Sequence, residues 1–113
     1  MARALEYDLP VAAANLSRGD AMQAAINGWP AVFDAETIRQ LGLDALPAEL
    51  RRKQETAMAE GHCNLLPAEM LPARARAQMA RDLVMARSIR TYFDRGVVLL
   101  AGDGHVRRAI GVP

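Results

Sequence analysis

An apolar run that ends at a glycine-rich turn constrains the fold of this 113-residue chain more than any other stretch. Residues 97–101 read Val-Val-Leu-Leu-Ala, and a continuous apolar run that begins with β-branched residues predicts a buried strand. The residues that follow, Gly102-Asp103-Gly104-His105, predict a tight turn directly after that strand. Ligands of open α/β sheets bind beyond the carboxyl ends of the strands, so we expect His105 to lie at a binding site.

The residues of this turn suit a site in two ways. Gly102 and Gly104 would let the backbone turn tightly and approach a ligand, while His105 can bind a metal, bind haem or move a proton. Arg107 and Arg108 follow, and near the start of a short helix they would attract carboxylates, phosphates or haem propionates. The alternative is an ordinary loop with a locally packed histidine and two solvated arginines.

Composition excludes several classes of protein. The formal net charge is +1, with 14 basic and 13 acidic residues, so we expect no binding to nucleic acid or to an anionic membrane through bulk charge. Cys63 is the only cysteine, which excludes an internal disulfide and a multi-cysteine zinc site. We expect it to be buried and inert. No apolar run approaches the roughly 18 residues of a membrane span, and no targeting signal is evident, so the sequence assigns no location.

Helix signals occupy most of the chain between two short apolar runs. Caps and apolar periodicity predict helices from Ser17 to Ile26, from Glu36 to Leu41, from Pro47 to about Glu60 and from Ala73 to Asp94. The runs at 9–14 and 97–101 predict two short strands. The predicted fold is therefore α/β and mainly helical, resembling part of a parallel sheet flanked by helices. Because two strands make a poor sheet, we expect residues 1–113 to be a single domain that forms part of a larger one.

The long helix carries a further set of candidate residues. Gln78, Arg81 and Asp82 share one face with Met85, since they are spaced three and four residues apart. Asp82 is suited to orient a histidine, and Arg81 is suited to hold a carboxylate. The alternative is a solvated helix surface.

Two more residues could ligate a metal or haem. His62 lies in a short non-helical link after the third helix, where it could be a ligand or support one. Tyr92 falls in the predicted last full turn of the long helix, and a tyrosinate can ligate haem iron. The alternative for both is a packing or surface role.

Taken in order, the motifs of this chain resemble the C-terminal half of the ChaN-like haem-binding uptake family, a branch of the Tiki superfamily. The resemblance covers roughly residues 9–113. It rests on Ala13-Ala-Asn-Leu-Ser-Arg18, Gly61-His62-Cys63 leading into Leu66-Pro67, Ala77-Gln78-Met-Ala-Arg81-Asp82-Leu-Val-Met85-Ala86, and Leu100-Ala-Gly-Asp-Gly-His105-Val-Arg-Arg with Gly111-Val-Pro.

The resemblance implies a haem-binding module related to iron-regulated haem uptake proteins, built on a mainly parallel sheet and acting as a homodimer that encloses the cofactor. It places His105 at the ligand, with His62 and Tyr92 as other axial candidates. Gly102 and Gly104 would allow close approach, Arg107 or Arg108 would meet propionates, and Gln78, Arg81 and Asp82 would support the ligand. Some members of the family resemble lipoproteins of the cell envelope. The resemblance therefore implies attachment to a membrane only if a longer parent protein carries a lipid anchor.

The wider superfamily implies an alternative from another class. It includes metal-dependent proteases, which use a glutamate and histidine motif near the N-terminus and a histidine in the position of His105. In that case His105 would ligate a divalent metal that activates water. This sequence lacks the N-terminal motif, so we expect no catalysis by this chain alone. A third alternative is an inactive remnant that dimerises and binds nothing.

Overall fold

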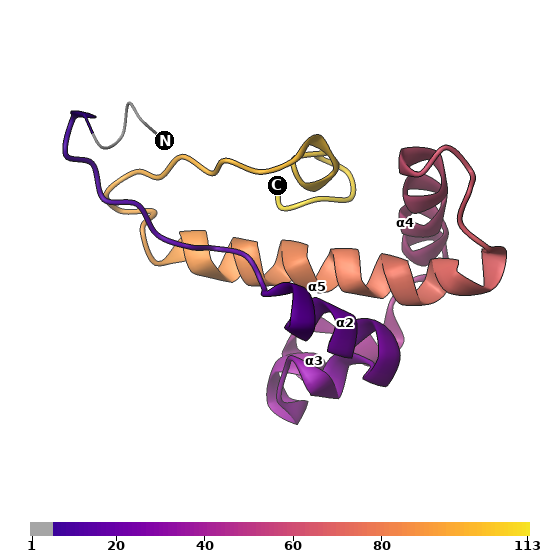
Figure 1. Cartoon of the computed structure of the whole chain (residues 1–113). Coiled ribbons are helices and arrows are strands. Elements are labelled where there is room, and N and C mark those ends of the chain that lie inside the picture. Colours follow the sequence, from indigo (N-terminus) through magenta and orange to yellow (C-terminus); the bar gives the residue numbers. More distant parts are fainter. Residues whose placement is uncertain (1–5) are drawn as a thin grey trace.

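The computed structural model describes residues 6–113, and helices form its framework (Figure 1). The α-helices are α2 (Arg18–Asn27), α3 (Ala35–Leu41), α4 (Ala48–Gly61) and α5 (Leu71–Arg90). Four single turns of 3-10 helix connect or follow them, at Trp29–Ala31 (η1), Leu43–Ala45 (η2), Ala68–Met70 (η3) and Asp103–His105 (η4).

Polar caps begin the first two of these helices where the sequence predicts. The Ser17 hydroxyl accepts a hydrogen bond from the Asp20 amide at 3.1 Å, and the Asp34 carboxylate accepts one from the Thr37 amide at 2.7 Å. Gly42 ends α3 in the left-handed conformation, with φ of 66°. The predicted bounds of α2 and α3 are thus confirmed to within a residue or two.

The end of α4 agrees with the prediction, whereas the end of α5 differs from it. Gly61 is the last residue of α4, and the left-handed turn that follows is made by Cys63 and Asn64, with φ of 55° and 58°. Helix α5 ends at Arg90, because the chain then turns through Thr91–Arg95 with short-range backbone bonds such as that from the Arg95 amide to the Tyr92 carbonyl. Tyr92 therefore lies beyond the helix.

The predicted α/β class with two short strands is wrong for the part of the chain that the structure describes, since residues 6–113 form no strand and no sheet. Segments 9–14 and 97–101 are extended, but no backbone hydrogen bond joins one to the other. Side chains of α5 contact the first segment instead, since the Ser88 hydroxyl lies 3.3 Å from the Ala14 carbonyl. An extended segment becomes a strand only beside a second one that completes its hydrogen bonds.

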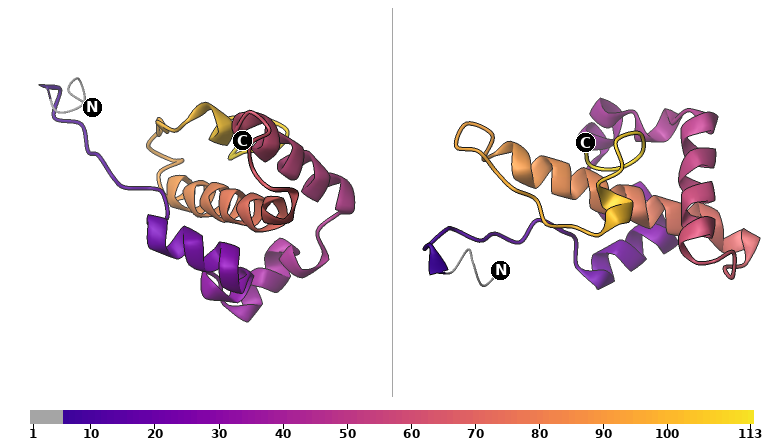
Figure 2. Two further views of the ribbon diagram at one scale, coloured as in Figure 1. Left: turned by 45° about the vertical axis from the view of Figure 1, so that its right-hand side comes forward. Right: turned by 90° about the horizontal axis from the view of Figure 1, so that it is seen from above.

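Helix α5 is the central element, and the other helices pack around it (Figures 1 and 2). Helix α2 lies along it, while α4 stands across one end. Ala24 of α2 and Ala80 of α5 are fully buried, and their small side chains let the two helices approach closely. Phe33 and Leu43 complete this core, with the Trp29 ring tilted against Phe33 at a centroid distance of 6.3 Å.

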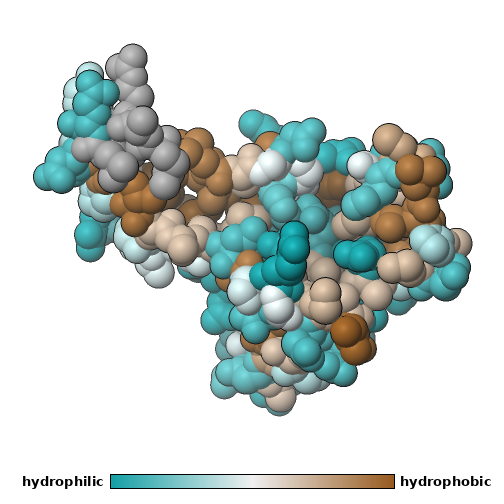
Figure 3. Space-filling model, in the orientation of Figure 1, coloured by the Kyte–Doolittle hydropathy of each residue, from teal (hydrophilic) through white to brown (hydrophobic). Residues whose placement is uncertain are grey.

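The molecule leaves much apolar surface outside this core, as the brown atoms of Figure 3 show. Its radius of gyration is 15.2 Å, against about 13 Å for a compact domain of this length. Val98 and Leu100 are 86% and 73% exposed in the segment that was expected to be a buried strand. None of the described helices is long and apolar enough to cross a membrane.

Candidate functional site

A histidine and a buried carboxylate from distant parts of the sequence meet on one side of α5. His105 closes the η4 turn, where its amide donates to the Gly102 carbonyl at 2.9 Å. Its Nδ1 lies 2.6 Å from Oδ1 of Asp82, which projects from the middle of α5. Only 17% of the His105 side chain and 8% of the Asp82 side chain are exposed. This is the contact expected of a carboxylate that orients a histidine.

The contact determines which ring nitrogen of His105 is available. When Asp82 is ionised, Nδ1 donates its proton to Oδ1, and Nε2 keeps a free lone pair. The amide nitrogen of Gln78 lies 3.0 Å from the same Nδ1. Because Nδ1 has either one proton or one lone pair, it can bond only one of these partners, and the shorter contact assigns it to Asp82. With Asp82 ionised, Nε2 is therefore the ring nitrogen of His105 that carries the lone pair.

Burial makes the ionised form of the Asp82 carboxyl unfavourable. Its second oxygen, Oδ2, is buried and has no hydrogen-bond partner among the described residues. Burial raises the pKa of Asp82 above its ordinary value of 3.8, and the hydrogen bond with His105 offsets this only in part. A buried oxygen without a partner is uncommon and favours keeping a proton on the carboxyl.

This raised pKa predicts a specific pH dependence of stability. The folded chain retains a proton on Asp82 that the unfolded chain has already lost, so the free energy of unfolding falls as pH rises above about 3.8 towards the folded pKa. Chemical denaturation of the wild type and of Asp82→Asn, compared from about pH 4 to pH 7, measures this contribution as the difference between the two curves. That difference should decrease with pH and then become constant. Asp103→Asn, which removes an exposed carboxyl of the same loop, is the matched control.

The loop after His105 is folded back and held by hydrogen bonds. The Val112 amide donates to the His105 carbonyl at 2.8 Å, and the Gly111 amide donates to the Arg107 carbonyl at 2.7 Å. The buried side-chain amide of Gln54, on α4, donates to the Ile110 carbonyl. These bonds tie the loop back to His105 and, through Gln54, to α4.

A cavity of about 150 Å³ lies between this loop, α4 and α5. Four of the predicted site residues line it, namely His62, Gln78, Gly104 and Arg107. The Nδ1 atom of His62 lies 2.9 Å from the Met58 carbonyl, to which it can only donate, so Nε2 of His62 is also free. His105 itself does not line this cavity, although its neighbours Gly104 and Arg107 do, and each of the two histidines has its Nδ1 engaged.

The remaining predicted residues lie elsewhere. Arg81 directs its guanidinium to the Leu16 carbonyl at 3.4 Å and so holds the N-terminal segment. Tyr92 follows Arg90, the last residue of α5. At a rise of 1.5 Å per residue, the end of this helix lies about 12 Å along its axis from Asp82. Arg108 is exposed and does not line the cavity. Both Arg107 and Arg108 follow the η4 turn, so they are not at a helix start as expected.

The loop requires a glycine at position 111, whereas the sequence predicts Gly102 and Gly104 as the glycines of the tight turn. Gly102 has φ of −64°, and a Cβ on Gly104 would meet the Gln78 amide at an ordinary 3.5 Å. A Cβ on Gly111 would instead overlap the His105 carbonyl oxygen and lie 2.8 Å from that of Arg107. The sequence offers Gly111 only as part of the Gly111-Val-Pro motif, with no local reason for a glycine, and the buried Gln54 has no sequence signal because it is a polar residue within a helix. Cys63, expected to be buried, is exposed.

A histidine oriented through Nδ1 by a carboxylate is found in proteins that bind metal ions or haem. The sequence model of one family, described as haem-binding uptake, Tiki superfamily, ChaN, matches residues 1–113. This chain therefore belongs to the ChaN haem-binding uptake family, as its motifs predicted. No curated protein and no solved structure matches it significantly.

Proposed function

We propose that this chain binds haem through His105 and serves the uptake of haem iron. The observation that carries the proposal is the 2.6 Å contact between His105 Nδ1 and the buried Asp82, which leaves Nε2 as a nitrogen donor. Histidine nitrogen is the commonest protein ligand of haem iron, and a carboxylate on Nδ1 increases its basicity. The family of the chain, haem-binding uptake proteins, supports the same cofactor.

The residues present can supply ligands to the haem iron, but they do not form a cavity large enough to enclose the porphyrin ring. The imidazole of His105 would hold the iron, His62 is the second axial candidate, and the charge of Arg107 suits a propionate. The cavity of about 150 Å³ is smaller than the roughly 300–1,000 Å³ of sites for drug-sized ligands, so it cannot contain a porphyrin. Another surface has to cover the ring.

A second copy of the chain is our proposal for that surface. The residues leading to and following the η4 turn expose large apolar side chains, including Val98, Leu100 and Val106. Exposed apolar patches of this kind mark interaction surfaces, and a porphyrin face between two such patches would be shielded from water. The proposal is therefore a homodimer with haem held between its subunits.

Titration of hemin into the purified protein tests the role of His105. We expect a saturable Soret shift in the wild type and an affinity at least about tenfold lower in His105→Ala, because a coordinate bond to iron is lost. Far-UV circular dichroism should be unchanged, since His105 lies in a loop. Added imidazole should partly restore the Soret band of His105→Ala by occupying the vacated position. His62→Ala tests the second axial candidate and should have the smaller effect.

Stoichiometry and mass separate this proposal from its alternatives. Haem held between two subunits predicts a sedimentation mass of two chains in the haem-bound state. An unchanged affinity in His105→Ala would contradict the assignment of the ligand. The absence of any Soret shift, together with a tightly bound divalent metal in elemental analysis, would favour the metal-dependent hydrolase alternative.

A further inference from the structure

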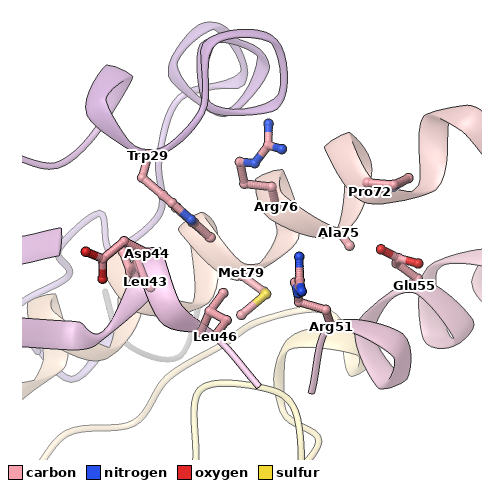
Figure 4. Close-up of a pocket in the computed structure, with 10 residues that line it drawn as sticks. All are labelled: Trp29, Leu43, Asp44, Leu46, Arg51, Glu55, Pro72, Ala75, Arg76 and Met79. Carbon is pink, nitrogen blue, oxygen red and sulfur yellow. The ribbon is translucent and has the colours of Figure 1, made fainter. Parts of the chain in front are cut away.

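A second cavity, of about 200 Å³, lies where α4 crosses α5 and where η1 and η2 approach them (Figure 4). It shares no lining residue with the cavity near His62 and Arg107, because it uses different faces of the two helices. Helix α4 contributes Arg51 and Glu55, and α5 contributes Ala75, Arg76 and Met79. The proposed haem site uses none of these residues.

Two guanidinium groups, those of Arg51 and Arg76, line this cavity together with two carboxylates, those of Asp44 and Glu55. Arg76 is held in place, since its Nη1 donates to the Ala25 carbonyl at 3.0 Å and lies 3.4 Å from that of Ala24. Arg51 forms no ion pair and no side-chain hydrogen bond within residues 6–113, although Glu55 lies one helical turn away. In Figure 4 the Arg51 guanidinium points in among the labelled residues, whereas the Asp44 carboxylate points away from them.

Apart from the carboxylates of Asp44 and Glu55, the other lining residues are apolar. Leu43 and Met79 are buried in its floor, and Trp29 presents the flat face of an indole at one side. The volume exceeds the roughly 30 Å³ share of one water molecule several times over but is below the roughly 300 Å³ at which drug-sized sites begin. The cavity therefore suits a small organic molecule and excludes a porphyrin.

We propose that this cavity binds a small carboxylic acid with a flat apolar body. The carboxylate would be bound by Arg51 and Arg76, because a guanidinium pairs with both oxygens of a carboxylate at once. The apolar body would lie against Trp29 and Met79 and remove their exposed surface from water. Glu55, at the edge of the same cavity, weakens anion binding and sets its affinity.

Trp29 is the only tryptophan of the chain, so its fluorescence reports on this cavity alone. Benzoate is a suitable probe, and benzamide is a neutral molecule of the same shape. We expect a saturable change in Trp29 emission with benzoate and at least about tenfold weaker binding of benzamide, which cannot form a charge-assisted pair. The shift of the Trp29 indole N–H signal in NMR spectra provides a second readout should the emission be insensitive.

Three charge variants test the assignment of residues. Arg51→Gln should weaken benzoate binding about tenfold, whereas Glu55→Gln should tighten it a few-fold because a like charge is removed. Arg52→Gln is the matched control, since Arg52 is an exposed neighbour on α4 that does not line the cavity. All three positions are outside the core, so equal melting temperatures are expected to show that the fold is retained.

Some outcomes would overturn the proposal. These are equal affinity for benzoate and benzamide, an equal loss of binding in Arg52→Gln and Arg51→Gln, or no response of Trp29 in either measurement at millimolar benzoate. Hemin binding by the same variants should be unchanged, and this separates a failure here from a failure of the haem proposal.

Discussion

Replacing Phe33 by alanine is expected to lower the free energy of unfolding by about 3–5 kcal/mol, the range observed for truncation of a buried aromatic side chain. Phe33 is 4% exposed and is the largest residue of the small core formed with Ala24, Leu43 and Ala80. The alanines on either side cannot move far enough to fill the space, because their helices are already in close contact. The cost should therefore lie in the upper part of that range.

Urea denaturation followed by circular dichroism measures this effect. Phe93→Ala is the matched control, because Phe93 is 62% exposed and its removal should change the free energy of unfolding by less than about 1 kcal/mol. A loss of similar size in both variants would show that the core does not lie where this structure places it. Domains of this length have a free energy of unfolding of only about 5–15 kcal/mol, so Phe33→Ala should be close to unfolding.

Replacing Gly111 by alanine is expected to release the loop that holds His105. The added Cβ would overlap the His105 carbonyl oxygen and lie 2.8 Å from that of Arg107, and both are backbone atoms that cannot turn away. Overpacking of this kind costs about 1–3 kcal/mol, and the loop can avoid it only by breaking the bonds from Gly111 and Val112. His105 should then separate from Asp82.

NMR chemical shifts of the His105 ring report this separation directly. In Gly111→Ala we expect the His105 ring signals to move from their wild-type positions and the hemin affinity to fall, while the signals of α2 and α3 stay unchanged. Gly104→Ala is the control, because its Cβ would make only an ordinary 3.5 Å contact with Gln78. A normal His105 environment in Gly111→Ala would mean that the loop does not depend on this close approach.

The helices were predictable because their signals are local. Ser17 and Asp34 cap the helices that follow them through contacts of three residues, which can be read directly from the sequence. The strands were not predictable for the opposite reason. The run at 97–101 has the composition of a buried strand, but a strand depends on a partner elsewhere, and residues 6–113 place none beside it.

The candidate site also has a part that the sequence predicts and a part that depends on the tertiary structure. The spacing of Gln78 and Asp82 on one helical face made them candidates, and the turn before His105 made that histidine one. Which residues of that face meet His105 depended on the path of the distant chain. Arg81, although next to Asp82, turns to the N-terminal segment instead. Gln54 holds the C-terminal loop across 56 residues of sequence, a contact that no local pattern indicates.

The sequence by itself determined the helices, the family and the identity of the two histidines, because caps, periodicity and motifs act over a few residues. Only the tertiary structure decided that Asp82 is the buried partner of His105, that Gly111 is the indispensable glycine, and that Arg51 and Arg76 line one cavity with Trp29. Each of these depends on a close approach between segments far apart in the chain. Such approaches arise from packing around α5, which local sequence signals do not encode.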